Sequence, residues 1–229
     1  MVDGITASSP TTLVARDVPI QVVSRERGFV SRGGDKLDGA LARLDVPVAG
    51  RRWLDAGAST GGFTDRLLTG GASEVIAVDV GYGQLDYGLR NDPRVVVMER
   101  TNVRLMRPSE LPWAPDGVTA DLSFISLRLV LPALREVAAP DADFVLLVKP
   151  QFEVGRELVG KGGVVRNPEH WQAAIAAVIE AAEDQGLGLC GATYSDVVGP
   201  KGNREFFVHL RAGCSSPPGA IDRAVEGAP

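Results

Sequence analysis

From Arg51 onward, the chain alternates between apolar runs of strand length and segments with helical periodicity. This alternation restricts the fold more than any other feature, because a helix between two strands returns the chain to the same sheet edge and makes the strands parallel. The last two runs are long enough to pair antiparallel. We predict an α/β fold with an open, mostly parallel, doubly wound sheet of seven strands. The predicted strands are Trp53–Ala58, Val75–Val80, Val95–Glu99, Val118–Phe124, Phe144–Val148, Leu189–Val198 and Phe206–Leu210.

Helices are predicted beside these strands. The clearest begins at Asn167, whose side chain can cap it, with Pro168 in the first helical position and Glu169 at the positive end of the helix dipole. This helix stops at Gly186. The other helices are predicted over Asp35–Leu44, through Leu67 and Leu68 to a stop at Gly70, and over Leu127–Val137.

The composition suits one compact domain with a short appendage, since 45% of the 229 residues are hydrophobic. No apolar run reaches the length of a membrane span, and Met1–Gly4 shows no signal-peptide pattern, so a cytoplasmic location is expected. The net charge of −5 argues against a protein that binds nucleic acid by charge alone, because such affinity comes largely from neutralising phosphates. Any activity on RNA must therefore depend on a local basic patch or on another module.

The two cysteines, Cys190 and Cys214, are far apart and lack the C-x-x-C spacing of redox and zinc motifs. We therefore predict neither a disulfide nor a zinc site, but small buried or incidental thiols in a reducing cytosol. No cluster of carboxylates suggests another metal, and no metal site is expected.

A glycine-rich turn follows the first predicted strand. Glycines let the backbone approach a ligand closely, and the helix that follows offers free N–H groups. The second strand ends in Asp79, 22 residues after Gly57, close to the spacing of about 20 at which a carboxylate reaches a ribose in dinucleotide folds. The turn consists of Asp55, Ala56, Gly57, Ala58, Ser59, Thr60, Gly61, Gly62 and Phe63.

Four interpretations of this turn compete. NAD binding requires G-x-G-x-x-G, but Ser59 stands in place of the second glycine. The G-x-S-x-G elbow of hydrolases also fits, but it needs a histidine partner, and neither His170 nor His209 lies on a strand-to-helix loop. S-adenosylmethionine fits with Asp55 near its amino group and Asp79 at its ribose. Finally, the turn could simply pack a helix on a strand.

Polar residues follow the fourth and fifth predicted strands, at the edge where ligands bind in such sheets. Asp121 ends one of these strands and Lys149 ends the other. A lysine at the end of an apolar strand is costly unless its ammonium has partners. Glu205 precedes the last strand, and Lys36 begins the helix ahead of the sheet. Taken singly, Asp121 could be a capping residue, and Lys36 and Glu205 could be solvated surface residues.

Taken together, Lys36, Asp121, Lys149 and Glu205 resemble, in that order, the Lys-Asp-Lys-Glu tetrad of ribose 2′-O-methyltransferases. The surrounding sequence is similar to that of the TlyA (hemolysin A) family over about residues 24–211. The FtsJ-like ribosomal RNA methyltransferases carry the same tetrad. The similar segments are Ser31–Leu37, Asp55–Thr64, Asp79–Leu85, Ala120–Ser126 and Leu147–Glu153.

The resemblance implies a class I, Rossmann-like methyltransferase that uses S-adenosylmethionine to methylate the ribose 2′-hydroxyl of cytidine in ribosomal RNA. A hydroxyl is a poor nucleophile, so the enzyme must align the reacting atoms and remove a proton. We assign Lys149 to accept that proton or to steer the hydroxyl's lone pair, and Asp121 and Glu205 to orient the two ammoniums. The predicted cofactor site comprises Asp55, Gly57, Ala58, Ser59, Thr60, Gly61, Gly62, Phe63, Asp79, Asn102, Asp121 and Phe124.

TlyA proteins carry an S4 RNA-binding domain ahead of the methyltransferase, and here residues 1–23 resemble only the closing portion of that domain. We predict an S4-like remnant over residues 1–23, a basic linker over 24–34, a methyltransferase domain over 35–212 and a disordered tail over 213–229. The expected partners are ribosomal RNA or ribosomal subunits, bound by a monomer. The predicted RNA-binding residues, each of which could also be a scattered solubilising charge, are Arg25, Arg27, Arg32, Arg156, Lys161, Arg166 and Lys201.

Other functions stay open at this stage. The family name records a haemolytic, membrane-active role, but the sequence offers no amphipathic or spanning segment for one. A methyltransferase for a small molecule or a protein could have the same fold, since fold does not determine substrate, although the paired lysines argue against this. An RNA-binding protein without methyl transfer is the third alternative.

Overall fold

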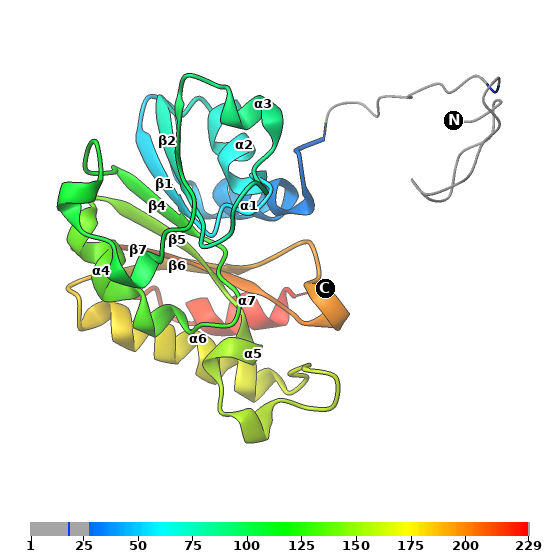
Figure 1. Cartoon of the computed structure of the whole chain (residues 1–229). Helices are drawn as coiled ribbons and strands as arrows, with labels where there is room; N and C mark the ends of the chain where they lie inside the picture. Colours follow the sequence, from blue (N-terminus) through cyan, green and yellow to red (C-terminus); the bar gives the residue numbers. More distant parts are fainter. Residues whose placement is uncertain (1–17, 19–27, 229) are drawn as a thin grey trace.

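The computed structural model describes residue 18 and residues 28–228. Apart from residue 18, the predicted S4-like remnant over residues 1–23 lies outside the described residues. The described chain forms one sheet with the strand order β3-β2-β1-β4-β5-β7-β6 and with helices on both of its faces (Figure 1). The strands are β1 (Arg52–Ala56), β2 (Glu74–Val78), β3 (Val95–Met98), β4 (Gly117–Ala120), β5 (Asp143–Val148), β6 (Gly188–Tyr194) and β7 (Phe206–Arg211).

The sheet is doubly wound. Strands β3, β2, β1, β4 and β5 pair in parallel, and β7 lies antiparallel between β5 and β6. The direction of winding reverses between β1 and β4, so the loops after these two strands diverge and leave a crevice at the carboxyl edge of the sheet. The predicted seven-stranded, mostly parallel sheet is confirmed, together with the antiparallel pairing of the last two strands.

The helices cover the two faces of the sheet. The α-helices are α1 (Arg32–Leu44), α2 (Gly62–Thr69), α3 (Tyr87–Arg90), α4 (Leu131–Val137), α5 (Pro150–Glu153), α6 (Pro168–Glu183) and α7 (Ala220–Glu226). The 3-10 helices are η1 (Val103–Leu105), η2 (Pro108–Glu110), η3 (Leu127–Leu129), η4 (Arg156–Leu158) and η5 (Pro200–Gly202).

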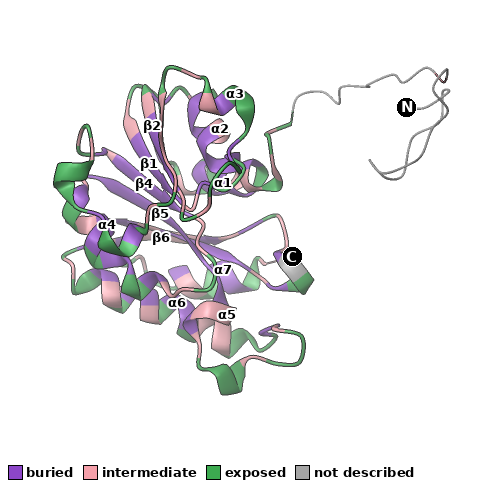
Figure 2. Ribbon diagram, in the orientation of Figure 1, coloured by how far each residue is buried: buried purple, intermediate pink, exposed green. Residues whose placement is uncertain are grey.

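Two apolar cores lie on opposite faces of the sheet, because successive side chains of a strand point to opposite faces. Trp53 of β1 belongs to the core beneath α1 and α2, whereas its neighbours Leu54 and Ala56 belong to the core beneath α4, α6 and α7. Figure 2 shows the result: the strands are buried, and exposed residues lie on the outer sides of the helices and on the loops. The cores therefore fix the strands and leave the loops free for a site.

Helix α1 begins at Arg32, earlier than the predicted start at Asp35. Ser31 caps the helix, since its Oγ accepts a hydrogen bond from the Gly33 N–H at 3.3 Å. A Cβ on Gly34 would lie 2.2 Å from the Phe29 side chain, so glycine at this position makes room for Phe29. The predicted linker over residues 24–34 therefore ends inside a helix.

Strand β4 ends at Ala120, whereas the predicted strand continued to Phe124. The φ angle of Phe124 is +65°, in the left-handed region, which is incompatible with a strand. The chain therefore leaves the sheet after Ala120 as a loop that ends at η3. The predicted helix over residues 127–137 is divided accordingly into η3 and α4.

The predicted disordered tail over residues 213–229 is wrong for the described part of that segment. Ala220, Ala224 and Val225 of α7 are buried in the core with α6 and β6 (Figure 1). The small residues that suggested a frayed end allow this short helix to pack closely. The tertiary contact, rather than local helix propensity, explains why the segment is ordered.

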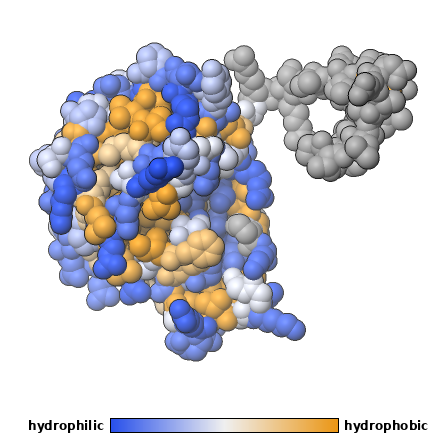
Figure 3. Space-filling model, in the orientation of Figure 1, coloured by the Kyte–Doolittle hydropathy of each residue, from blue (hydrophilic) through white to orange (hydrophobic). Residues whose placement is uncertain are grey.

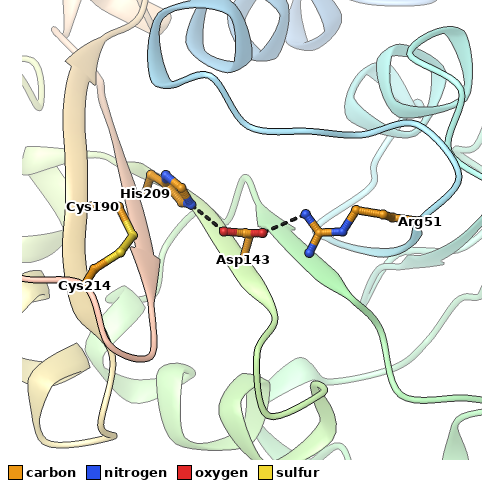
Figure 4. Close-up of a disulfide and its surroundings, with 5 residues drawn as sticks. All are labelled: Arg51, Asp143, Cys190, His209 and Cys214. Atoms are coloured by element: carbon orange, nitrogen blue, oxygen red, sulfur yellow. Dashed lines mark hydrogen bonds and ion pairs between the residues drawn. A yellow bond between two sulfur atoms is a disulfide. The ribbon is translucent and has the colours of Figure 1, made fainter.

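The prediction that Cys190 and Cys214 form no disulfide is also wrong. The structure joins them in a disulfide with 5.2 Å between the two Cα atoms (Figure 4). Cys190 lies on β6, and Cys214 follows β7, which pairs with β6. Gly188 permits the approach, because a Cβ there would lie 1.9 Å from the Cys214 carbonyl oxygen. Spacing along the chain could not reveal this contact, which depends on the pairing of the two strands.

An ionic cluster near the disulfide joins β5, β7 and Arg51, the residue before β1 (Figure 4). The buried Asp143 carboxylate accepts hydrogen bonds from Arg51 Nη1 at 2.7 Å and contacts His209 Nε2 at 2.6 Å. Burial opposes ionisation of Asp143, but the hydrogen bonds with His209 and Arg51 outweigh it and hold the pKa of this carboxyl below its ordinary value. His209 lies on β7, an inner strand of the sheet, and this cluster explains its presence without a catalytic role.

Replacing Cys190 with serine is expected to lower the free energy of unfolding by about 3 kcal/mol, because the disulfide closes a loop with a sequence separation of 24 residues. Urea unfolding without reductant measures this difference. A thiol reductant should lower the stability of the wild type to the same value and leave Cys190→Ser unchanged. A wild type of equal stability with and without reductant would contradict the prediction.

Candidate functional site

Three neighbouring cavities lie along the carboxyl edge of the sheet, and Ser123 lines all of them. The first cavity, of about 550 Å³, is lined by Gly57, Ser59, Asp79, Val80, Gln84, Asn102, Val103, Asp121, Leu122, Ser123, Phe124, Ile125 and Val130. The second cavity, of about 300 Å³, is lined by Ser31, Arg32, Gly33, Lys36, Gly57, Ala58, Ser59, Thr60, Gly62, Phe63, Asp121, Ser123 and Lys149. The third cavity, of about 320 Å³, is lined by Ser123, Phe124, Lys149, Gln151, Phe152, Val159, Gly163, Lys201, Asn203 and Glu205.

The glycine turn after β1 forms the wall between the first and second cavities. Gly57 has a φ of +85°, and a Cβ on it would lie 2.5 Å from the Asp121 carbonyl oxygen, so glycine is required there by both conformation and space. Most of the residues predicted to bind a cofactor line these two cavities. Gly61 does not: it caps α2 and packs against Leu89.

Asp79 lies at the end of β2, on the first cavity. Its two carboxylate oxygens accept hydrogen bonds from the backbone N–H groups of Ser59 at 2.8 Å and Gly81 at 2.7 Å. The carboxylate is thus held at a fixed position and retains acceptor capacity for a ligand. Asn102 lies on the same cavity, where its side chain caps η1 by accepting from the Arg104 N–H.

The structure does not place Asp55 at a cavity. Asp55 is fully buried and accepts a hydrogen bond from Thr64 Oγ1 at 2.7 Å, with Thr119 Oγ1 at 3.3 Å. Burial raises the pKa of this carboxyl to about 7, although the hydrogen bonds from the two threonines favour the charged form. In this structure, Asp55 therefore joins β1, β4 and α2 beneath the site instead of offering a carboxylate to a ligand.

Lys149 stands at the junction of the second and third cavities. Its ammonium is buried, and its Nζ lies 2.5 Å from Asp121 Oδ1 and 2.9 Å from Ser123 Oγ. Pro150 follows immediately and begins α5, which fixes the backbone direction after β5. The contact with Asp121 accounts for a buried lysine at this strand end.

Lys36 and Glu205 form the second pair of the predicted tetrad. Lys36 Nζ contacts Glu205 Oε2 at 2.6 Å, and both side chains are buried. Lys36 lines the second cavity and Glu205 lines the third. All four residues of the predicted tetrad therefore line the two cavities that meet at Lys149. The other carboxylate oxygen of Glu205 is buried without a hydrogen-bond partner. A buried oxygen of this kind can accept from a group that enters the site.

Further aromatic and polar residues complete the site. Phe124, which was predicted to bind the cofactor, lines the first and third cavities. Phe124 is 91% exposed and packs against Phe152, with 5.4 Å between the ring centroids. Ser123 and Gln151 line the third cavity and were not predicted. Their signal was available in the sequence, because each follows Asp121 or Lys149 by two residues and so lies on the same strand-end loops.

Large apolar side chains are exposed on the loops around this edge, which is unusual for side chains of this size. Figure 3 shows apolar residues interspersed with hydrophilic ones on the visible face. The exposed large apolar residues on the segments after β2, β3 and β4, some of them in α3, η1 and η3, are Val80, Tyr82, Tyr87, Leu105, Phe124 and Leu129.

The predicted RNA-binding residues fall into three groups. Arg25 and Arg27 lie outside the described residues. Arg32 and Lys201 are exposed and line the second and third cavities, respectively. The third group lies on the segment after α5, where Arg156, Lys161 and Arg166 are all exposed.

The chain is similar to methyltransferases and to proteins named as hemolysins. The family model described as FtsJ-like methyltransferase matches residues 29–212. The chain is 54% identical over 211 residues to the Mycobacterium tuberculosis protein named 16S/23S rRNA (cytidine-2′-O)-methyltransferase TlyA, covering 92% of this chain and 79% of that protein. It is 37% identical over 210 residues to the Brachyspira hyodysenteriae protein named Hemolysin A, covering 91% of this chain and 87% of that protein.

Solved structures have the same fold. A Lactococcus lactis protein that has been named as a hemolysin superposes with a TM-score of 0.81 at 41% identity, over 86% of this chain and 97% of that chain. Within residues 28–228, no helix is long and apolar enough to cross a membrane. The described part of the chain also contains no group of three or more metal-ligating side chains placed to hold an ion.

Replacing Asp55 with asparagine is expected to reduce the pH dependence of stability. Because the pKa of Asp55 is about 7 in the folded protein and 3.8 for an ordinary aspartate, the folded state binds an extra proton between these values. The resulting stabilisation is present at low pH and is lost as the pH rises through about 7. Wild type should therefore lose about 3 kcal/mol more than Asp55→Asn between about pH 5 and about pH 8.

Urea unfolding of both proteins at the two pH values tests this difference. Asp184→Asn, at the exposed end of α6, serves as the matched control and should follow the wild type. Parallel pH profiles for wild type and Asp55→Asn would show that Asp55 ionises normally.

Proposed function

This chain belongs to the FtsJ-like methyltransferase family and is 54% identical to one of its TlyA members. We propose that it methylates the ribose 2′-hydroxyl of a cytidine in ribosomal RNA, with S-adenosylmethionine as methyl donor. The observation that carries this proposal is the buried Lys149, held by Asp121 and Ser123 where two cavities meet. The first and second cavities suit the methyl donor, and the third cavity suits the acceptor nucleoside.

The residues present fit an adenosine-containing donor. The first and second cavities have volumes in the range of roughly 300–1,000 Å³ that is typical of small-molecule sites. Gly57 leaves open the space that a Cβ would fill beside the Asp121 backbone. Asp79 would accept from the ribose hydroxyls, Asn102 would lie near the base, and the turn from Ala58 to Phe63 would face the methionine portion. When bound, S-adenosylmethionine supplies a methyl group already activated by its sulfonium.

The chain's own residues then have to align the hydroxyl and remove its proton. An ammonium has no lone pair, so Lys149 can act as the base only after it has lost a proton; the neutral amine then has two N–H donors and one lone pair. Asp121 and Ser123 lie where they accept from both donors, at 2.5 and 2.9 Å. The lone pair is left for the proton of the acceptor hydroxyl, which would pass to Nζ. Glu205 pairs with Lys36, which also lines the second cavity, so that the buried charge of Lys36 has a partner.

The third cavity has the features of a nucleoside site. Phe124 presents an exposed aromatic ring at its mouth, and base stacking on an aromatic ring contributes about 1–3 kcal/mol. Lys201 is exposed on the same cavity and Arg32 on the second, where they would contact phosphates. The remaining basic residues, Arg156, Lys161 and Arg166, would extend this contact. We propose that the chain acts in the cytoplasm, as a monomer, on ribosomal subunits.

Replacing Asp79 with alanine is expected to raise the Kd for S-adenosylmethionine about tenfold or more, because it removes the ribose acceptor and the two backbone hydrogen bonds that position the turn. Isothermal titration calorimetry measures this change. Asp184→Ala, remote from the cavities, is the control and should bind as the wild type does. An unchanged Kd for Asp79→Ala would place the ribose elsewhere.

Replacing Lys149 with alanine is expected to abolish methyl transfer while leaving the Kd for S-adenosylmethionine within about twofold of the wild-type value, since general-base catalysis contributes roughly 10²–10⁴ in rate. The assay follows labelled methyl groups from S-adenosylmethionine into ribosomal subunits, with the modified position mapped to a ribose or a base. Lys149→Arg keeps the charge but cannot lose its proton, so it should also be inactive.

Several outcomes would contradict the proposal. Transfer retained by Lys149→Ala would remove this residue from the mechanism. Label on a base, on protein or on a small molecule would change the substrate class. Dye leakage from liposomes treated with the protein, without any methyl transfer, would support the membrane-active alternative instead.

A further inference from the structure

Glu153 is a buried carboxyl for which the proposed reaction has no use. It is the last residue of α5, only four positions after Lys149, and it is 6% exposed. Burial raises the pKa of the Glu153 carboxyl above its ordinary value, and hydrogen bonds from Ser126 and Leu127 oppose that rise. Burying a carboxyl is costly, so its partners indicate what it does for the fold.

All partners of the Glu153 side chain lie on one segment, at the end of the loop that follows β4. Oε1 accepts from the Leu127 N–H at 2.7 Å, and Oε2 accepts from Ser126 Oγ at 2.5 Å. Arg128 completes the cluster, with Nε 3.6 Å from Oε2 and a hydrogen bond from Nη2 to the Glu153 carbonyl at 3.2 Å. Glu153 therefore fastens the beginning of η3 to the end of α5.

Two segments that carry the site are joined by this contact. One is the Asp121–Ser126 loop after β4, and the other is the Lys149–Glu153 segment after β5. They touch at three points in succession: Lys149 with Asp121 and Ser123, Phe152 with Phe124, and Glu153 with Ser126. Along the chain, the contact of Glu153 with Ser126 is the farthest from the ends of β4 and β5.

The loop needs an attachment at that far end. Asp121 is fixed by the sheet, because its N–H bonds to the Ala56 carbonyl at 3.0 Å. Beyond it, Ser123 and Phe124 are exposed, and Phe124 has a left-handed φ of +65°. A phenylalanine in this conformation costs free energy and persists only where its surroundings hold it. Glu153 supplies the hold at Ser126 and Leu127, on the other side of Phe124.

We propose that Glu153 is a positioning residue that clasps the Asp121–Ser126 loop to the Lys149–Glu153 segment and thereby keeps Ser123 at the Lys149 amine and Phe124 at the third cavity. This inference rests on the proposed methyl transfer, because transfer is its readout. Glu153 touches neither of the first two cavities. The residues that it contacts directly, Ser126, Leu127 and Arg128, do not line those cavities either, so we expect a larger effect on the transfer step than on the binding of S-adenosylmethionine.

The test compares Glu153→Ala, Glu153→Gln and the matched control Glu157→Ala. Glutamine can keep both contacts, since its oxygen can accept from Leu127 N–H and its amide can donate to Ser126 Oγ. Glu157 is exposed on η4, close by in the chain. Each variant is assayed for kcat with ribosomal subunits, for the Kd of S-adenosylmethionine and for thermal unfolding.

Glu153→Ala is expected to lower kcat about tenfold or more, because small misplacements of reacting groups have large effects on rate. The Kd for S-adenosylmethionine should stay within about twofold of the wild-type value, and Glu153→Gln should recover at least about half of the wild-type kcat. Glu157→Ala should resemble the wild type. Ser126→Ala should also lower kcat, and adding it to Glu153→Ala should have little further effect, because both remove one contact.

Other results would overturn the inference. A wild-type kcat in Glu153→Ala would contradict the proposed role of Glu153. A loss of cofactor binding as large as the loss of kcat would also contradict it, because that result indicates general unfolding. If Glu153→Ala does not fold, Ser126→Ala decides: an unchanged kcat in that variant contradicts the clasp. Failure of the wild type itself to transfer methyl groups would instead contradict the proposed function, so the two failures are distinguishable.

Discussion

The burial of two lysine side chains is the constraint on which the rest of the site depends. An ammonium removed from water costs several kcal/mol unless a carboxylate and further acceptors surround it. Here Asp121 and Ser123 satisfy Lys149, and Glu205 satisfies Lys36. Each lysine and its partners come from different elements, so the pairs can form only when α1, the loop after β4, the end of β5 and the beginning of β7 meet at one place.

The strand order explains how these elements meet. Because β1 and β4 are neighbours at the point where the winding reverses, Gly57 lies against the Asp121 backbone, and the two strand-end loops share the first cavity. Strand β7 lies antiparallel beside β5, so its beginning is next to the end of β5. The register pairs Phe206 with Val148, and this places Glu205 beside the segment that starts at Lys149. The antiparallel position of β7 between β5 and β6 thus completes the sheet and also places Glu205 in the site.

Sequence patterns predicted those parts of the molecule that depend on local regularity. The buried strands form continuous apolar runs, Asn167 and Pro168 mark the start of α6, and the polar residues Asp121 and Lys149 stand out because they interrupt such runs. What escaped prediction depends on contacts between distant segments: the Cys190–Cys214 bond, the packing of α7 and the burial of Asp55 beneath Thr64 and Thr119. A carboxylate at a strand end is the same in sequence whether it faces a ligand or a threonine.

The distance along the chain between Lys36 and Glu205 has a consequence for biosynthesis. The two residues that form this ion pair are separated by 169 positions, and chains emerge from the ribosome N-terminus first, at about 5–20 residues per second. The glycine turn, Asp79 and Lys149 are all synthesised before Glu205, so the walls of the first two cavities can exist while Lys36 still lacks its carboxylate. A nascent chain would therefore have a place for a ligand before it had a complete tetrad, and the ion pair would form only when β7 enters the sheet.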